Sequence, residues 1–205
     1  MTTIILIRHG HVEGINPPRF RGRQDVPLSE RGVAQANITA ARIAASWRPA
    51  AIYTSCMARC VATGVLIGEA CHIEPIATAD LNDLDYGDWQ WKTYVEVEEG
   101  SPDLFQLWFS VPHLVRFPNG ESMQDIVLRS ANALRKVVEG FPNETVVLVG
   151  HDSINRALLL QLLDQPLSAY WRVEQDPCAI NLIQVKKGAI RVLSVNDARH
   201  VQQFG

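Results

Sequence analysis

The chain has 205 residues and a formal net charge of −3, with 47% hydrophobic and 20% charged side chains. This length suits a single domain, residues 1–205, and is enough to bury a substantial core without crosslinks. A net charge near zero argues against a nucleic-acid partner, because nucleic-acid-binding domains carry a strong basic excess. No apolar run approaches the ~18 residues of a membrane span, so we also expect no membrane partner.

The start of the chain and its cysteines favour a cytoplasmic protein. The four apolar residues before Arg8 are too few for a signal-peptide core. The cysteines form neither a CxxC pair nor a zinc-ligand grouping with histidine; they are Cys56, Cys60, Cys71 and Cys178. We therefore expect reduced thiols in the cytoplasm and no metal site.

Apolar runs typical of strands alternate with amphipathic stretches typical of helices. The first strand is predicted at 3–7, and a helix at 32–47 follows Ser29, which is placed as its N-cap. The remaining predictions, in chain order, are a strand at 50–54, a helix at 57–70, a strand at 73–77, a helix at 121–139, a strand at 145–149, a helix at 153–163 and a hairpin of strands at 180–185 and 190–195. This order predicts an α/β three-layer sandwich, with a mostly parallel central sheet flanked by helices.

Residues 86–117 are unusually aromatic. This segment holds eight of the fifteen aromatic residues, namely Tyr86, Trp89, Trp91, Tyr94, Phe105, Trp108, Phe109 and Phe117. One interpretation is a small cap whose own core needs large side chains, and another is an aromatic wall over a ligand pocket; both can hold together. We therefore expect residues 86–117 to form an aromatic-rich cap insertion within the domain.

Two strand-like runs end in a histidine, IILIRHG at 4–10 and VVLVGHD at 146–152. Because parallel strands bring their carboxyl ends to one edge of a sheet, His9 and His151 are expected to face the same crevice. Arg59 falls in the first turn of a predicted helix, where a cation opposes the helix dipole unless an anion binds there. Taken singly, each histidine could be a hydrogen-bonded core residue, and Arg59 or Arg8 a structural cation. Their convergence favours a phosphate site.

Six blocks occur in a fixed order along residues 4–156. They are Leu6-Ile7-Arg8-His9-Gly10, the stretch Arg21-Gly22-Arg23-Gln24-Asp25-Val26-Pro27-Leu28-Ser29-Glu30-Arg31-Gly32, Tyr53-Thr54-Ser55 with Arg59 and Thr63, Leu81-Asn82-Asp83-Leu84-Asp85-Tyr86-Gly87-Asp88-Trp89, Pro118-Asn119-Gly120-Glu121-Ser122, and His151. Together they resemble the histidine phosphatase superfamily, also called the phosphoglycerate mutase-like family. The pattern is most similar to bacterial members such as α-ribazole phosphatases and broad-specificity phosphatases.

The resemblance implies a mechanism. His9 would attack phosphorus through one ring nitrogen and form a phosphohistidine, while its other ring nitrogen donates a hydrogen bond to a nearby carbonyl. Arg8, Arg59 and His151 would surround the phosphoryl oxygens, and Asp83 would protonate the leaving oxygen and later activate water. Further substrate contacts are implied for Arg21, Gly22 and Asp152. The resemblance implies no cofactor and no metal.

The sequence departs from the family pattern at several positions. Asp83 stands where the family usually has Glu and is one methylene shorter, which puts its reach in question. Asp85 is a rival for the acid role, although it aligns with a non-catalytic position. The other departures are His11 at a usual Glu, Ile15 at a frequent Asn, Trp91 at a usual Gly, and Asp152-Ser153 at a usual pair of small glycines.

These features predict a phosphomonoesterase that hydrolyses a small phosphorylated metabolite through His9. One alternative is a phosphoglycerate mutase, whose family members usually carry a longer insertion and C-terminal extension for which this chain has little room. Another alternative is a non-catalytic phospholigand-binding protein that lost turnover through changes such as Asp83. A homodimer is an open possibility.

Overall fold

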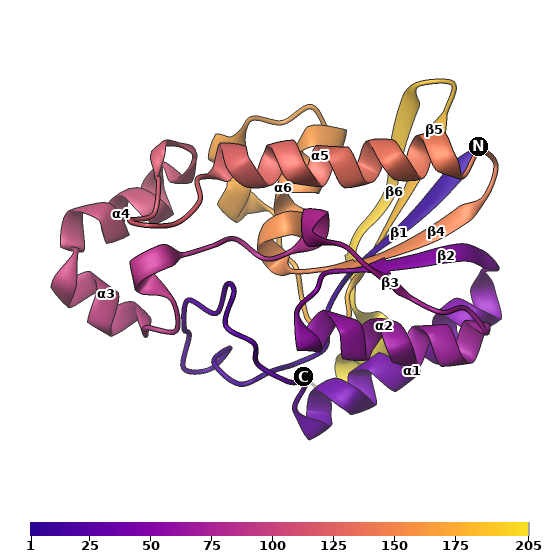
Figure 1. Ribbon diagram of the computed structural model, residues 1–205, viewed down its shortest axis with the longest axis horizontal. Coiled ribbons are helices and arrows are strands. Elements are labelled where there is room, and N and C mark those ends of the chain that lie inside the picture. The colour runs from indigo at the N-terminus through magenta and orange to yellow at the C-terminus, as the bar shows by residue number, and fades with distance from the viewer. Residues whose placement is uncertain (205) are drawn as a thin grey trace.

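A twisted sheet runs through the centre of the molecule (Figure 1). The computed structural model describes residues 1–204, and six strands of this range form one sheet in the order β3-β2-β4-β1-β5-β6. The strands are β1 (Thr2–Arg8), β2 (Pro49–Thr54), β3 (Ile76–Ala77), β4 (Thr145–Gly150), β5 (Ile180–Lys186) and β6 (Ala189–Asp197). Strands β1 to β4 are parallel, whereas β5 and β6 form an antiparallel hairpin at one edge. The predicted mostly parallel sheet is confirmed.

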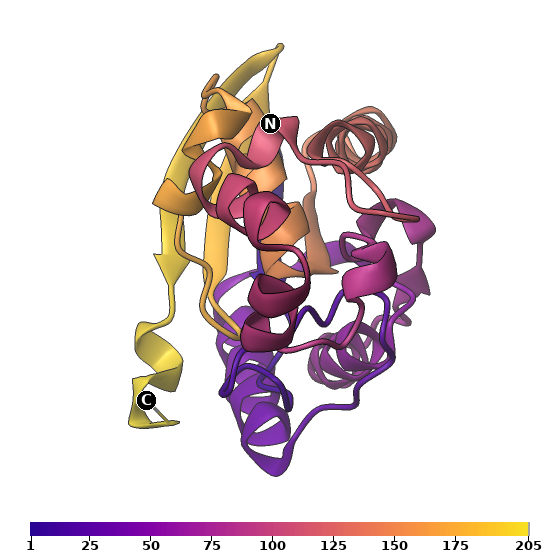
Figure 2. The same cartoon turned by 90° about the vertical axis from the view of Figure 1, so that its left-hand side faces the viewer.

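Helices cover both faces of the sheet (Figures 1 and 2). Helices α1 (Glu30–Ser46) and α2 (Ala58–Cys71) lie on one face, and α5 (Met123–Gly140) and α6 (Asp152–Leu162) lie on the other. Alternate residues of β1 serve the two cores: Ile5 packs with the side of α1 and α2, whereas Leu6 packs with the side of α5 and α6. Both faces of β1 are buried, which explains its continuous apolar run and confirms the three-layer α/β fold.

Most predicted elements lie within two residues of the observed bounds. The Ser29 side chain accepts a hydrogen bond from the backbone N–H of Gly32 at 3.1 Å and so caps α1 as predicted. The exception is β3, which covers Ile76–Ala77 rather than 73–77. His72 adopts a left-handed conformation and the Ile73 N–H bonds back to the carbonyl of Gly68, so these residues end α2 instead of extending the strand.

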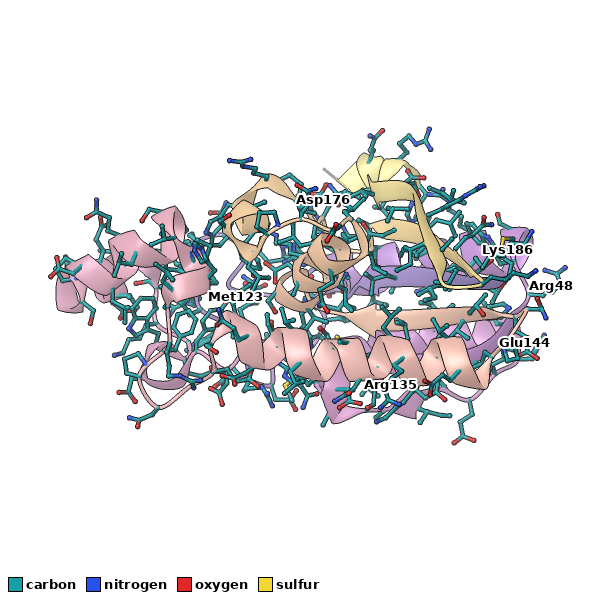
Figure 3. The ribbon with its side chains drawn as sticks, turned by 90° about the horizontal axis from the view of Figure 1, so that it is seen from above. Arg48, Met123, Arg135, Glu144, Asp176 and Lys186 are labelled. Atoms are coloured by element: carbon teal, nitrogen blue, oxygen red, sulfur yellow. The ribbon has the colours of Figure 1, made fainter. Side chains whose placement is uncertain are left out.

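The aromatic segment contains two helices that the sequence pattern did not predict. Helices α3 (Tyr94–Gly100) and α4 (Pro102–Ser110) lie at the end of the molecule to which the parallel strands point (Figures 1 and 2). Figure 3 places Met123 at the end of α5 nearest to them, and Arg48, Glu144 and Lys186 at the opposite end of the molecule. Trp108 and Phe117 are buried with ring centroids 5.1 Å apart, edge to face. Large side chains therefore pack a core of this segment, while its role as a cap stays a prediction.

Short 3₁₀ segments join the longer elements; they are Ala79–Leu81, Gly87–Trp89, Pro112–Leu114, Leu167–Arg172 and Arg199–Phe204. Among the described residues, no helix has both the length and the apolar character needed to cross a membrane.

Candidate active site

His9 follows β1 directly, and its backbone N–H bonds to the carbonyl of Gly150 at 3.0 Å, which fixes it beside β4. Its ring Nδ1 lies 2.7 Å from the carbonyl oxygen of Gly10. Because a carbonyl oxygen can only accept, Nδ1 must carry the proton, and Nε2 keeps a free lone pair. Burial, reinforced by Arg59 and Arg8, holds the pKa of His9 well below its usual value. The ring is therefore neutral at pH 7 and suited to nucleophilic attack.

His151 follows β4 and lies at the start of α6, with its ring centroid 5.2 Å from that of His9. The expected meeting of the two strand-end histidines therefore occurs. The Arg59 Nε donates to Nδ1 of His151 at 3.2 Å, so the proton of this ring is on Nε2, which donates to the Ser55 hydroxyl at 2.8 Å. The Ser55 hydroxyl in turn donates to the side-chain oxygen of Asn82 at 3.0 Å. Burial, followed by Arg59 and His9, lowers the pKa of His151, which keeps the ring neutral.

Arg59 occupies the first turn of α2 and is fully buried. Its Nη2 donates to Asp83 Oδ2 at 3.0 Å and to the carbonyl of Gly22 at 2.6 Å, and its Nη1 donates to the carbonyl of Gln24 at 2.8 Å. Two loops therefore supply the acceptors that a cation at a helix N-terminus needs: the loop at 22–24 and the loop at 82–86, here called the acidic loop because it carries Asp83 and Asp85. Arg59 joins three separate segments of the chain around the two histidines.

Asp83 completes a buried cluster with His9, His151 and Arg59. Its Oδ1 accepts from the Ser153 hydroxyl and from the backbone N–H of Leu84, the latter at 2.9 Å, while its Oδ2 bonds Arg59 and lies 3.5 Å from Nδ1 of His151. Burial raises the pKa of Asp83 above its usual value, and both Arg59 and the Ser153 hydroxyl oppose this rise. A carboxyl group with a raised pKa holds its proton more tightly and is suited to act as a proton donor.

The rival acid, Asp85, lies outside the cluster. Its Oδ1 accepts from the backbone N–H of Gly87 at 2.9 Å, and its own N–H donates to Glu121. Asp85 therefore shapes the turn that follows the acidic loop. Of the two candidate acids, only Asp83 contacts Arg59.

Arg8 and Arg21 hold donors with no protein partner. Arg8 Nη1 donates to the carbonyl of Gln175, and Arg21 Nη1 donates to the carbonyl of Gly14 at 2.7 Å. Among the described residues, the buried Nε atoms of both arginines have no hydrogen-bond partner. Because buried N–H groups are nearly always satisfied, these donors are available to an anionic ligand.

The remaining predicted contact residues have distinct surroundings. Gly22 has φ of +40°, and a Cβ atom there would lie 2.6 Å from the carbonyl oxygen of Leu84, so only glycine fits. Asp152 is the first residue of α6 and is partly exposed. The substrate contacts of both residues stay predictions.

Two of the departures from the family pattern have structural explanations. His11 Nδ1 lies 2.8 Å from the hydroxyl of Ser29, the residue that caps α1. Trp91 has φ of +65°, a conformation that glycine adopts easily and that explains why glycine is usual there. The Arg19 guanidinium carbon lies over the Trp91 ring, 5.2 Å from the ring centroid, in a cation–π contact.

The family model described as the histidine phosphatase superfamily (branch 1) matches residues 4–198. The chain belongs to the histidine phosphatase superfamily. The expected family and the expected phosphatase class of enzyme are thereby confirmed.

Known relatives of this histidine phosphatase cover nearly its whole length. It is 32% identical over 204 residues to phosphoserine phosphatase 1 of Hydrogenobacter thermophilus, covering 100% of this chain and 96% of the relative. It is 28% identical to a metal-independent phosphoserine phosphatase of Arabidopsis thaliana, covering 100% of this chain and 85% of the relative. The solved structure of Bacillus stearothermophilus YhfR superposes with a TM-score of 0.93 at 30% identity, covering 98% of this chain and 100% of that chain.

Two residues that support this histidine phosphatase site, Arg129 and Gln175, carry no signal in the sequence pattern. Arg129 of α5 donates to the carbonyls of Asn82 and Asp83, the latter at 2.8 Å, and so holds the acidic loop in place. Gln175, whose carbonyl binds Arg8, is buried with its amide bonded to Asn181 at 2.9 Å. None of these residues follows a motif, because each acts through a contact between segments distant in sequence.

Proposed function

We propose that this histidine phosphatase hydrolyses a small phosphomonoester through a phosphohistidine intermediate on His9. The observation that carries the proposal is the contact between Nδ1 of His9 and the Gly10 carbonyl. This contact leaves the neutral ring with a free lone pair on Nε2, beside three cationic or hydrogen-bonding groups. Those groups are Arg8, Arg59 and His151. Relatives named as phosphoserine phosphatases support a small phosphorylated substrate.

The first step transfers the phosphoryl group to the protein. Nε2 of His9 forms a bond to phosphorus as the P–O ester bond breaks, and protonated Asp83 gives its proton to the leaving oxygen, releasing an alcohol. In the second step, Asp83 takes a proton from water as the water oxygen attacks phosphorus and the P–N bond breaks. Inorganic phosphate leaves, and His9 and the Asp83 acid are restored.

The ion pair between Arg59 and Asp83 links substrate binding to protonation. A phosphoryl dianion at His9 would compete with Asp83 for the Arg59 guanidinium, which lies 3.0 Å from the carboxylate. A carboxyl group that loses a neighbouring cation binds its proton more tightly, so the pKa of Asp83 would rise further. Substrate binding would thus favour the protonated form that the first step requires.

The proposal predicts a leaving-group signature for Asp83→Asn. We expect kcat/KM for an alkyl phosphate to fall by about 10²- to 10⁴-fold, because the alkoxide needs a proton as it leaves. The fall for p-nitrophenyl phosphate should be much smaller, since p-nitrophenolate is a good leaving group without protonation. Steady-state kinetics with both esters measure the contrast.

Asp85→Asn is the matched control, because it removes the same charge outside the cluster. Its effect should be small and equal for the two esters. Equal losses for both esters in Asp83→Asn, or the contrast appearing in Asp85→Asn instead, would contradict the assignment of Asp83 as the acid.

Asp83 and Ser153 both depart from the family pattern, and they contact each other: the Ser153 hydroxyl donates to Asp83 Oδ1. The shorter acid is thus held by a hydroxyl where the family usually has a glycine. Removing this donor in Ser153→Ala should raise the pKa of Asp83, because a hydrogen bond to the carboxylate favours its charged form. The basic limb of the kcat/KM profile, where the acid loses its proton, should then move to higher pH.

Full pH profiles of the wild type and Ser153→Ala with one alkyl phosphate check this prediction. The substrate's own ionisation is common to both profiles and cancels in the comparison. Exposed Ser168→Ala serves as the control and should leave the limb in place. A basic limb that moves to lower pH, or does not move, would show that Ser153 does not act on the acid.

Two assays separate the proposed hydrolysis from the two alternatives. With 3-phosphoglycerate as substrate, release of phosphate without formation of an isomer supports a phosphatase, whereas isomer formation with little phosphate would establish a mutase. EDTA-insensitive hydrolysis of p-nitrophenyl phosphate that is lost in His9→Ala excludes a purely ligand-binding protein. Phosphate binding without hydrolysis across a broad panel of phosphoesters would overturn the proposal.

A further inference from the structure

Asp152 and Arg156 are charged side chains that the proposed chemistry does not use. They are four residues apart on α6 and therefore lie on the same face of the helix, one turn from each other. His151 immediately precedes Asp152 in the chain, and Arg8 and His9 lie close enough to the Asp152 carboxyl group to lower its pKa. The pair thus lies beside the phosphoryl site, on an element already anchored to it.

Arg156 is held in place by aromatic rings rather than by hydrogen bonds. Its guanidinium carbon lies 5.3 Å from the ring centroid of Tyr170 and 4.9 Å from that of Trp171. The Trp171 ring is itself stacked on Phe109 of α4, with centroids 5.1 Å apart and an interplanar angle of 22°. The aromatic segment therefore contributes, through Trp171, to fixing the plane of the Arg156 guanidinium.

The donors of Arg156 are largely unused. The residue is only 8% exposed, yet among residues 1–204 its Nε and Nη1 atoms have no hydrogen-bond partner. Its Nη2 atom lies 3.9 Å from the exposed carboxylate of Glu174, which is beyond hydrogen-bonding distance. A buried donor without a partner is destabilising, so these N–H groups are suited to bind an acceptor on a ligand. A planar carboxylate matches the fork of a guanidinium group.

Asp152 adds a charge of the opposite sign. Burial opposes ionisation of its carboxyl group, but Arg8, Arg21 and Arg156 outweigh burial and hold the pKa of Asp152 well below its usual range. A fixed negative charge weakens the binding of a ligand that carries only anionic groups. It favours a ligand that also carries a cation. The charges around His9 are therefore complementary to a phosphate, a carboxylate and an ammonium group together.

We propose that Asp152 binds the ammonium group and Arg156 the carboxylate of a phosphorylated α-amino acid, while its phosphoryl group lies at His9. This assignment rests on the proposed function, because it needs a phosphoryl site at His9. It assigns a substrate contact to Asp152, which replaces a glycine of the usual family pattern. It also assigns a role to the aromatic rings beside Arg156, which would position the guanidinium group for the carboxylate.

Three phosphomonoesters test the two contacts separately. O-phospho-L-serine carries both groups, 3-phosphoglycerate has a hydroxyl in place of the ammonium group, and O-phosphoethanolamine lacks the carboxylate. Wild-type kcat/KM should be highest for O-phosphoserine by about tenfold or more over each of the others, since one charged hydrogen bond contributes about 1.5–3 kcal/mol. This comparison does not depend on the folding of any variant.

Variants then assign each preference to a residue. Asp152→Asn should lower the ratio of kcat/KM for O-phosphoserine to that for 3-phosphoglycerate by about tenfold or more. Arg156→Gln should lower the ratio for O-phosphoserine to O-phosphoethanolamine by a similar factor. Asp164→Asn and Arg172→Gln remove the same charges at exposed positions and should leave both ratios as they are in the wild type.

The possible failures are distinguishable. If the wild type hydrolyses neither these esters nor p-nitrophenyl phosphate, the proposed function itself is wrong, and the subsite with it. If the wild type hydrolyses p-nitrophenyl phosphate but does not prefer O-phosphoserine, only the subsite is overturned. Equal losses for all three esters in both variants would also overturn the subsite, because they would indicate structural roles for Asp152 and Arg156.

Discussion

Replacing His9 with alanine is expected to lower kcat for p-nitrophenyl phosphate by about 10³-fold or more, because the variant has no nitrogen to attack phosphorus. In the wild type the His9 ring is neutral and buried, and the Gly10 carbonyl orients its Nε2 lone pair for attack. His151 cannot substitute readily, since its two ring nitrogens already bond Arg59 and Ser55. Steady-state kinetics with purified protein measure the loss.

A matched histidine change separates this effect from general damage. His72 is exposed, lies at the end of α2 and has a left-handed conformation that asparagine tolerates, so His72→Asn should retain wild-type activity. Thermal unfolding and circular dichroism of His9→Ala establish that the variant is folded. A folded His9→Ala protein with activity within tenfold of the wild type would contradict nucleophilic attack by His9.

Arg59→Met is expected to reduce both activity and stability. Loss of a buried cation beside the reacting phosphoryl group should lower kcat/KM by about 10²- to 10³-fold. The free energy of unfolding should fall by about 3–5 kcal/mol, because the buried Asp83 carboxylate loses its ion-pair partner. Arg59→Lys should recover activity only in part, since an ammonium group cannot reach Asp83, Gly22 and Gln24 at once.

A second substitution separates the two effects of Arg59. In Arg59→Met/Asp83→Asn the unpaired carboxylate is removed, so the free energy of unfolding should rise relative to Arg59→Met. The kcat/KM for p-nitrophenyl phosphate, which depends little on the Asp83 proton, should stay as low as in Arg59→Met. Arg31→Met, at an exposed position of α1, is the control for loss of an arginine. If the double variant regained activity together with stability, Arg59 would act only as a structural partner of Asp83.

The fold and the centre of the site follow from local sequence features. Alternating strand and helix patterns predict the layered sheet because each element carries its own periodicity, and a strand buried on both faces, such as β1, is apolar throughout. The meeting of His9 and His151 follows from parallel strands alone, despite the long segment between them. The choice of Asp83 over Asp85 came from the family resemblance, and the geometry favours the same residue.

The surroundings of the site could not be predicted in the same way. Ser153 reaches Asp83, Arg129 reaches the acidic loop, and Gln175 reaches Arg8 through side-chain contacts between segments that are 46 to 167 residues apart. Such contacts leave no periodic signal in the sequence. Helices α3 and α4 were missed for a different reason: they have 7 and 9 residues, too few turns for a helical period to stand out.

The formation of phosphohistidine on His9 can be tested directly by rapid quenching of turnover with a ³²P-labelled phosphomonoester, followed by mapping of the labelled peptide. We expect label that is stable in base and lost in mild acid, as a P–N bond requires, and we expect it on His9. The label should be absent from His9→Ala and should disappear when unlabelled substrate is added in excess. Label on any other residue, or steady turnover of the wild type with no covalent label, would contradict the proposed mechanism.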